Sequence, residues 1–315
     1  MPDQHPFHGT PEEVRTLLRK IGPIWGRDIR AHSALVKQAY RPLLAAAPKN
    51  GIEVIRDQPY GSQPRQVLDL FLPMPGAGID QPAKSAGKRR PVVAFVHGGA
   101  FVRGDKRTDE QMYDNVLYWF ARQGYIGVNI EYRSAPGAPY PGGADDVAAA
   151  IDWLHREITH RDGDPDRMFL VGHSAGGTHA ATYACDPAVG YLGAHVAGLV
   201  LISARLRADD LPENPNADGV RAYFGKDAEC YERRSPVTHC DTCRLPVLIV
   251  IAEHENPLLD VYGLEMAFRL GKARRKAPGL LWVKGHNHMS VVAHFNTAEE
   301  YLGREILEFF ASIPS

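Results

Sequence analysis

The chain has 315 residues, of which 44% are hydrophobic and 23% charged, a composition typical of one globular domain and unlike that of a disordered or fibrous chain. Its 36 Lys and Arg residues balance 37 Asp and Glu residues, and no basic stripe is present, so we expect no nucleic-acid partner. Residues 1–14 lack the features of a signal peptide, and no apolar run reaches the ~18 residues of a membrane span, which predicts a cytoplasmic protein without membrane association.

The cysteines Cys185, Cys230, Cys240 and Cys243 are too few for a disulfide scaffold. Only the last two form a CxxC pair, and His239 stands beside it. A structural zinc ion takes four protein ligands, and this pattern lacks a second ligand pair. We therefore expect reduced, partly buried thiols and no metal.

The first segment of the chain shows helical periodicity. Apolar residues recur at helical spacing within residues 10–47, where Thr10 is expected to cap the first helix and a second helical stretch follows Pro23. The period then changes to that of strands at residues 52–55 and 67–72, separated by a turn rich in Pro, Gly and Ser. These two segments predict an antiparallel pair of strands.

Strands and helices alternate after a connection over residues 75–91 that is rich in Gly and Pro. Continuous apolar runs, typical of strands buried on both faces of a parallel sheet, lie at 92–96, 126–130, 168–171, 199–202, 247–251 and 280–283. Helical patterns at 145–158 and 260–272 lie between them, and Asp145 and Asp146 are expected to cap the first of these or to favour its dipole. The alternation predicts a three-layer α/β domain.

The strongest motif is GHSAGG at residues 172–177, directly after the run 168–171 and before a helical stretch of small residues. It is a G-x-S-x-G sequence in the strand, turn and helix context that this motif requires. The tight turn holds the serine in a strained conformation, and Gly172 and Gly176 let the flanking backbones approach closely. Ser174 is therefore the predicted nucleophile.

A second motif, HGGAF at residues 97–101, follows the run 92–96. Attack by Ser174 on a carbonyl would create an oxyanion that needs backbone N–H donors, and glycine lets the main chain reach the reacting centre. Gly98 belongs to this loop. We expect His97 to orient the loop by hydrogen bonding rather than to act in catalysis.

Together these motifs resemble the α/β-hydrolase superfamily, and within it the hormone-sensitive-lipase-like esterases and the ferulate-esterase and kynurenine-formamidase-like group. The resemblance extends from about residue 52 to the carboxyl terminus. It rests on Tyr60-Gly61, LDLFLP at 68–73, HGGAF at 97–101, EYRSAP at 131–136, Tyr140-Pro141, Asp145-Asp146, Trp153-Leu154, GHSAGG at 172–177, YFG at 223–225 and SPV at 235–237.

The resemblance implies an α/β-hydrolase fold, with a mostly parallel central sheet, antiparallel amino-terminal strands, helices on both faces and an amino-terminal helical cap. Residues 1–50 would form the cap segment and residues 51–315 the catalytic domain, with 205–235 as a candidate cap insertion. The family's oxyanion donors fall on the backbone amides of Gly99, Ala100 and Ala175. Ala100 stands where relatives usually have a third glycine, a change that keeps the backbone donor.

A serine triad of this family also needs an acid and then a histidine later in the chain. His286 and His288 both follow the last strand-like run. The family pattern, with the catalytic imidazole before a bulky residue, selects His288, which precedes Met289. His286 is then an exposed loop residue or a donor to a neighbouring group.

The triad acid is expected in the loop 252–260, after the run 247–251. The family pattern places it at Glu255, although relatives usually have aspartate there and lack the intervening Asn256. Glutamate can also fix the tautomer of the histidine and stabilise the imidazolium. Asp260 remains the alternative, because either position leaves room for one helix and one strand before the histidine.

These residues predict a serine carboxylesterase that hydrolyses small to medium acyl or aryl esters through an acyl-enzyme intermediate, without a cofactor. An amide or formamide hydrolase that uses the same triad is one alternative, and a catalytically silent ligand-binding member of the fold is another. The expected partner is a small-molecule ester, and a homo-oligomer is left open. The candidate pocket aromatics are Trp25, Phe101, Tyr223 and Phe224.

Overall fold

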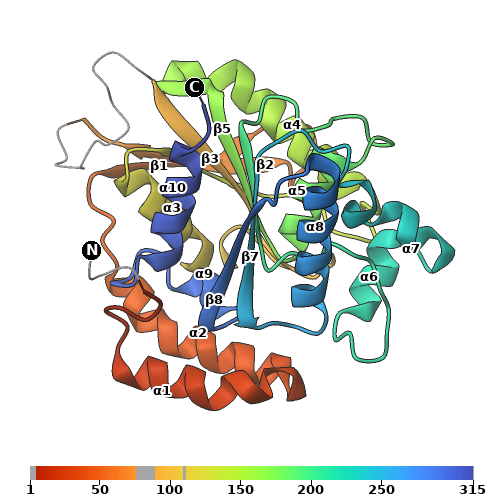
Figure 1. Cartoon of the computed structure of the whole chain (residues 1–315). Coiled ribbons are helices and arrows are strands. Elements are labelled where there is room, and N and C mark those ends of the chain that lie inside the picture. Colours follow the sequence, from red (N-terminus) through yellow and green to blue (C-terminus); the bar gives the residue numbers. More distant parts are fainter. Residues whose placement is uncertain (1–4, 76–88, 109–110, 315) are drawn as a thin grey trace.

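The computed structural model describes residues 5–75, 89–108 and 111–314, and its eight strands form one central sheet (Figure 1). The strands are β1 (Ile52–Pro59), β2 (Val67–Pro73), β3 (Arg90–Val96), β4 (Ile126–Ile130), β5 (Gly163–His173), β6 (Gly198–Ile202), β7 (Val247–His254) and β8 (Gly279–Asn287). The helices are α1 (Glu12–Ile21), α2 (Ile29–Ala46), α3 (Met112–Arg122), α4 (Gly142–Glu157), α5 (Ala175–Cys185), α6 (Ala217–Phe224), α7 (Glu229–Arg234), α8 (Leu259–Arg274), α9 (Ser290–Ala293) and α10 (Tyr301–Ala311).

The strand order is β1-β2-β4-β3-β5-β6-β7-β8. β2 runs antiparallel to both β1 and β4, and all other neighbouring strands are parallel. All six apolar runs lie within strands. The predicted mostly parallel sheet with antiparallel amino-terminal strands is therefore confirmed.

Side chains alternate between two helical layers along the central strands, as the two-residue period of a strand requires. Val92, Ala94 and Val96 of β3 pack in one hydrophobic cluster with residues of α4, α5 and α8. Val93 and Phe95 pack in a second cluster with residues of α3 and α10. Figure 1 shows these helix groups on opposite sides of the sheet. Burial on both faces explains why the strands read as continuous apolar runs.

The amino-terminal helices pack onto the end of the sheet toward which β7 and β8 point, as Figure 1 shows. The 3₁₀ helix η1 (Gly22–Arg27) connects α1 to α2 and contacts β7 and β8. Val14, Leu18, Trp25 and Val36 are buried in the same cluster as Phe95. The segment expected to form a cap thus shares a hydrophobic core with the sheet.

The first helix begins without the expected cap. Pro11 occupies the N-cap position of α1, and no side chain caps this helix. The Thr10 hydroxyl instead donates to Oε2 of Glu299 at 2.6 Å, across 289 positions of the chain. The capping prediction was wrong because a buried carboxylate distant in sequence takes the hydroxyl as a donor.

Asp145 and Asp146 do not cap α4 either, since Pro141 precedes the helix and no side-chain cap is formed. Asp146 is fully buried and accepts a hydrogen bond from Nη2 of Arg133 at 2.7 Å. Asp145 accepts from the Tyr191 hydroxyl at 3.0 Å. Asp145 nevertheless lies in the first turn of α4, as the dipole alternative expects, and both carboxylates connect the helix to other segments.

The cysteines are free thiols, of which Cys185, Cys240 and Cys243 are buried. His239, beside the CxxC pair, lies with Nε2 at 2.7 Å from the carbonyl oxygen of Arg233. The imidazole therefore has a backbone partner, and the three buried thiols belong to the hydrophobic core.

Residues 76–88 of the predicted 75–91 connection lie outside the described residues. Among the helices of the described residues, none combines the length and the apolar character needed to cross a lipid bilayer.

Candidate active site

Ser174 lies in a sharp turn between β5 and α5. Its backbone has φ 55° and ψ −121°, a conformation that costs energy for a residue with a side chain. A Cβ atom on Gly172 would lie 2.6 Å from Cα of Gly177, and one on Gly176 would lie 2.2 Å from the carbonyl oxygen of Val96. Both motif glycines are thus required by close backbone approach, which holds the strained serine in place.

His288 connects Ser174 to a carboxylate. Nε2 of His288 lies 3.1 Å from Oγ of Ser174, and Nδ1 lies 2.8 Å from Oε2 of Glu255. Because the carboxylate only accepts, Nδ1 carries the proton and Nε2 is left to accept the serine proton. Ser174, His288 and Glu255 thus have the geometry of a nucleophile, a base and an orienting acid.

Glu255 is held on its other oxygen by two donors. Oε1 accepts from the amide of Ala252 at 2.9 Å and from the hydroxyl of Ser203. The side chain is 2% exposed, so its orientation is fixed by buried contacts. The carboxylate that the structure brings to His288 is therefore Glu255, whereas Asp260 lies in the first turn of α8.

The backbone amides of Gly99, Ala100 and Ala175 are the predicted oxyanion donors. In the described part of the chain, none of these three N–H groups donates a hydrogen bond. A Cβ on Gly99 would lie 1.7 Å from the carbonyl oxygen of Arg103, so only glycine fits the turn. Ala100 adopts φ 50°. Gly99 and Ala100 line the same cavity as Ser174, which leaves their amides available to a ligand.

His97 anchors the HGGAF loop through both nitrogens of its ring. Its Nδ1 lies 2.8 Å from the carbonyl oxygen of Gly98, and its Nε2 lies 3.1 Å from Oε1 of Glu131. Glu131 also accepts from the amides of Lys106 at 2.9 Å and Tyr132 at 3.1 Å. Burial alone would raise the pKa of Glu131, but the hydrogen bond from His97 and nearby positive charges lower it. This anchor was not predicted; its signal was a carboxylate directly after an apolar run.

His173, between Gly172 and Ser174, connects the HGGAF loop to the backbone of His288 through hydrogen bonds of its ring. Burial lowers its pKa well below the ordinary value, so the ring is neutral. Nε2 lies 3.0 Å from the carbonyl oxygen of His288, which only accepts, so Nε2 carries the hydrogen. Nδ1 must then accept from the Tyr113 hydroxyl at 3.2 Å, whose oxygen accepts from the amide of Gly98 at 3.2 Å.

Comparisons with known proteins identify relatives of parts of the chain. The BD-FAE family model matches residues 78–197, which contain the motifs at 97–101 and 172–177. Esterase LipC of Mycobacterium tuberculosis is 30% identical over 232 residues, 72% of this chain and 49% of LipC. The probable isoprenylcysteine alpha-carbonyl methylesterase ICMEL1 of Oryza sativa subsp. japonica is 34% identical over 129 residues, 41% of this chain and 27% of the relative. The chain thus spans less than half the length of either relative.

The fold comparison covers nearly the whole chain. The crystal structure of esterase B from Lactobacillus Rhamnosis superposes with a TM-score of 0.67 at 20% identity, over 96% of both chains. Its match extends over the sheet and the helices on both faces. The chain therefore has an α/β-hydrolase fold.

Ser174 and His288 lie on the wall of a cavity of about 740 Å³. One face of α2 borders the cavity, together with Pro215 and Asn216 from the expected cap insertion 205–235. The α2 residues on the wall are Ile29, Arg30, Ser33, Ala34 and Lys37. Apolar contact with a ligand is available from Met112, Tyr113 and Met289.

The four aromatics predicted to line the pocket do not line this cavity. Trp25 is buried, and its Nε1 donates to Oδ1 of Asn256 at 2.9 Å. Phe101, Tyr223 and Phe224 pack in a separate cluster, in which the rings of Phe101 and Tyr223 stack with centroids 4.9 Å apart. The prediction was wrong because these large rings pack in the core of the fold.

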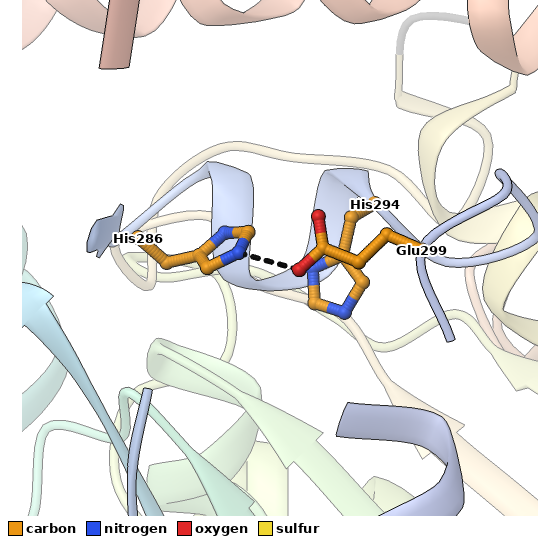
Figure 2. A group of neighbouring side chains, drawn as sticks. All are labelled: His286, His294 and Glu299. Atoms are coloured by element: carbon orange, nitrogen blue, oxygen red, sulfur yellow. Dashed lines mark hydrogen bonds and ion pairs between the residues drawn. The ribbon is translucent and has the colours of Figure 1, made fainter. Parts of the chain in front are cut away.

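A second polar cluster consists of His286, His294 and Glu299, all buried (Figure 2). One ligand-type atom from each lies within 4.8 Å of the others, and Nε2 of His286 lies 2.8 Å from Oε1 of Glu299. The same oxygen accepts from the amide of Phe7 at 2.9 Å, while Oε2 accepts from Thr10. Three donors thus hold the carboxylate, and we assign the cluster a structural role in tying residues 7–10 to the rest of the fold.

His286 is therefore not the exposed loop residue that the sequence left open. Its ring is fully buried and stacks on Phe7 with centroids 4.6 Å apart. His294 donates through Nδ1 to the carbonyl oxygen of Ser290 at 3.0 Å, and burial lowers the pKa of His294 to about 4. Burial opposes ionisation of Glu299, but the two neighbouring histidines lower the pKa of its carboxyl.

Proposed function

We propose that this protein is a serine carboxylesterase that hydrolyses small to medium esters. The observation that carries the proposal is that Ser174, His288 and Glu255 are joined by hydrogen bonds, with Ser174 and His288 on a cavity wall. The backbone amides of Gly99 and Ala100, which donate no hydrogen bond in the described part of the chain, line the same cavity. A nucleophile, a base, an acid and oxyanion donors in one cavity are the requirements of acyl transfer.

In the acylation step, Oγ of Ser174 attacks the ester carbonyl while Nε2 of His288 takes the hydroxyl proton. The carbonyl oxygen becomes an oxyanion, which the amides of Gly99, Ala100 and Ala175 stabilise. Glu255 stabilises the imidazolium that forms on His288. When the intermediate collapses, the ester C–O bond breaks and His288 protonates the departing alcohol, leaving an acyl group on Ser174.

In the deacylation step, His288 takes a proton from a water molecule, which attacks the acyl carbonyl. The same amides stabilise the second oxyanion. Collapse of this intermediate returns the proton to Oγ of Ser174 and releases the acid. The net reaction consumes one ester and one water and yields one alcohol and one acid.

The comparisons support ester rather than formamide hydrolysis, because the reported relatives are named as esterases or methylesterases. A tributyrin phosphonate inhibits esterase B of Lactobacillus Rhamnosis, and a phosphonate that modifies a serine is a mimic of the tetrahedral intermediate proposed here. The cavity of about 740 Å³ suits a small or medium ligand.

The test is hydrolysis of p-nitrophenyl esters of increasing acyl length, beside an aryl formamide, by wild type and by Ser174→Ala. We expect ester hydrolysis by wild type, its loss in the variant and labelling of Ser174 by a fluorophosphonate. Hydrolysis of the formamide without hydrolysis of the esters would move the assignment to amide hydrolysis. Absence of both activities and of labelling would favour the ligand-binding alternative.

We further propose which segments of the chain cover the catalytic cavity. Residues 1–50 act as a cap on the catalytic domain 51–315, supported by the position of α2 on the cavity wall. Residues 205–235 add Pro215 and Asn216 to that wall. A cytoplasmic location and self-association also remain part of the proposal.

A further inference from the structure

The charged Lys and Arg side chains on the described part of the cavity wall are all positive. Among the described residues that line it, Arg30 and Lys37 come from α2 and Arg103 from the loop after HGGAF, and no Asp or Glu contributes. The whole chain carries a net charge of −1, so the positive charge is a local property of this cavity. A cleft lined by one sign of charge concentrates ligands of the opposite sign.

Two of these cations lack an acidic partner. In the part of the chain that the structure describes, no carboxylate lies within ion-pair distance of Arg30 or Arg103, and neither residue has an interaction beyond those given. Nη2 of Arg103 donates to the neutral amide oxygen of Asn216 at 3.1 Å.

Arginines elsewhere in the fold show the contrast. Arg56 lies 2.7 Å from Asp69, and Arg133 lies 2.7 Å from Asp146. Those guanidinium groups are neutralised by buried carboxylates, which fix them as structural elements. The guanidinium groups of Arg30 and Arg103 keep their donors for a ligand, and a planar guanidinium binds a carboxylate through two parallel hydrogen bonds.

We propose that the cavity takes esters that carry a free carboxylate, such as monoesters of dicarboxylic acids, with Arg30 and Arg103 as the specificity-determining residues. This inference rests on the proposed esterase function. The reacting carbonyl lies at Ser174, and the second, ionised carboxylate of the substrate pairs with the arginines. Neutral esters of equal length lack that interaction and bind only through the apolar part of the wall.

The experiment compares two matched pairs of esters by titration of the acid released. Monomethyl adipate and methyl hexanoate differ in a carboxylate on the acyl side, whereas 4-acetoxybutanoate and butyl acetate differ in one on the alcohol side. At low ionic strength we expect kcat/KM for the anionic member of at least one pair to exceed that of its neutral partner about tenfold, the scale of one partly solvated ion pair. Added salt should reduce the preference.

The variants assign the preference to residues. In the double variant Arg30→Ala with Arg103→Ala, the ratio of anionic to neutral kcat/KM should fall toward one. Arg30→Lys with Arg103→Lys should keep part of it. Arg27→Ala removes a nearby exposed arginine that does not line the cavity, and it should leave the ratio unchanged.

Each outcome is decisive. Equal or lower kcat/KM for both anionic esters, with Ser174-dependent hydrolysis of the neutral ones, would overturn the carboxylate specificity and leave the esterase intact. A preference that survives in the double alanine variant would overturn the assignment to these arginines. Absence of hydrolysis on all four esters and on the p-nitrophenyl series would overturn the esterase itself.

Discussion

The hydroxyl of Tyr113 lies 3.2 Å from Nδ1 of His173 and donates its proton to that nitrogen. The direction is fixed, because the opposite nitrogen of the ring donates to the carbonyl oxygen of His288. Tyr113 also accepts the amide proton of Gly98. One phenol therefore links the HGGAF loop to the turn of Ser174 and to the backbone of His288.

Tyr113→Phe should lower kcat about tenfold and change KM little, because the loss of one hydroxyl leaves the Gly98 amide and Nδ1 of His173 without partners. The measurement is the separate determination of kcat and KM on a p-nitrophenyl ester. Tyr118→Phe, on the same helix but outside the cavity wall, is the matched control. An equal effect of both variants, or a change confined to KM, would contradict the positioning role of Tyr113.

Glu255→Gln should reduce kcat about a thousandfold, because an amide cannot stabilise the imidazolium and its NH₂ group opposes the required tautomer of His288. Glu255→Asp should retain part of the activity, since the charge remains but the reach is shorter. Asp260→Asn should stay within about twofold of wild type, on the scale of a surface substitution. Steady-state kinetics on one ester decides, and a larger loss in Asp260→Asn than in Glu255→Gln would reverse the assignment.

Acid should destabilise the fold from about pH 6.5 downward. The pKa of buried His294 is lowered from 6.5 to about 4, so the unfolded chain binds its proton first and stability is lost as the pH falls between those values. At pH 5 this one group accounts for about 2 kcal/mol. The lowered pKa of Glu299 adds a further loss that begins as the pH falls through the range in which a free glutamate titrates and continues below it.

Urea unfolding at several pH values measures this dependence. His294→Gln should flatten the curve between pH 6.5 and 4, whereas His160→Gln, at an exposed position, should leave its slope unchanged. Equal slopes for wild type and His294→Gln would refute the assignment to His294.

The chain should self-associate through the edge of the sheet at β8. Leu280 and Trp282 on this terminal strand are 46% and 40% exposed, and Leu264 and Phe268 on the adjacent α8 are 45% and 70% exposed. In the expected dimer, a second copy would cover this apolar surface and pair with the strand edge that an isolated chain leaves open. Sedimentation should show a dimer for wild type and a monomer for Phe268→Glu, while Leu192→Glu, at another exposed leucine, remains dimeric.

The sequence predicted the strands well because burial on both faces leaves a continuous apolar run, as in residues 92–96. It predicted the turn at Ser174 because the constraint on its glycines is local in the chain. It could not decide between Glu255 and Asp260, since the answer depends on how the loop enters α8, where Leu258 adopts φ 66°.

The helix-capping rules, which consider only neighbouring residues, failed where the side chain has a partner elsewhere in the chain. Thr10 has the type of a helix cap, but Glu299, 289 positions away, takes its hydroxyl. Asp146 likewise pairs with Arg133 instead of its own helix. The four expected pocket aromatics failed for a related reason, because the side chain of Trp25 or Phe101 suits a core as well as a cavity wall.

The hydrogen bond from Trp25 to Asn256 joins the amino-terminal segment to the residue next to Glu255. Replacing this segment with that of a relative would therefore exchange two properties at once, the wall that selects the ester and the support of the triad acid. A substitution in this segment should therefore change substrate preference and turnover number together.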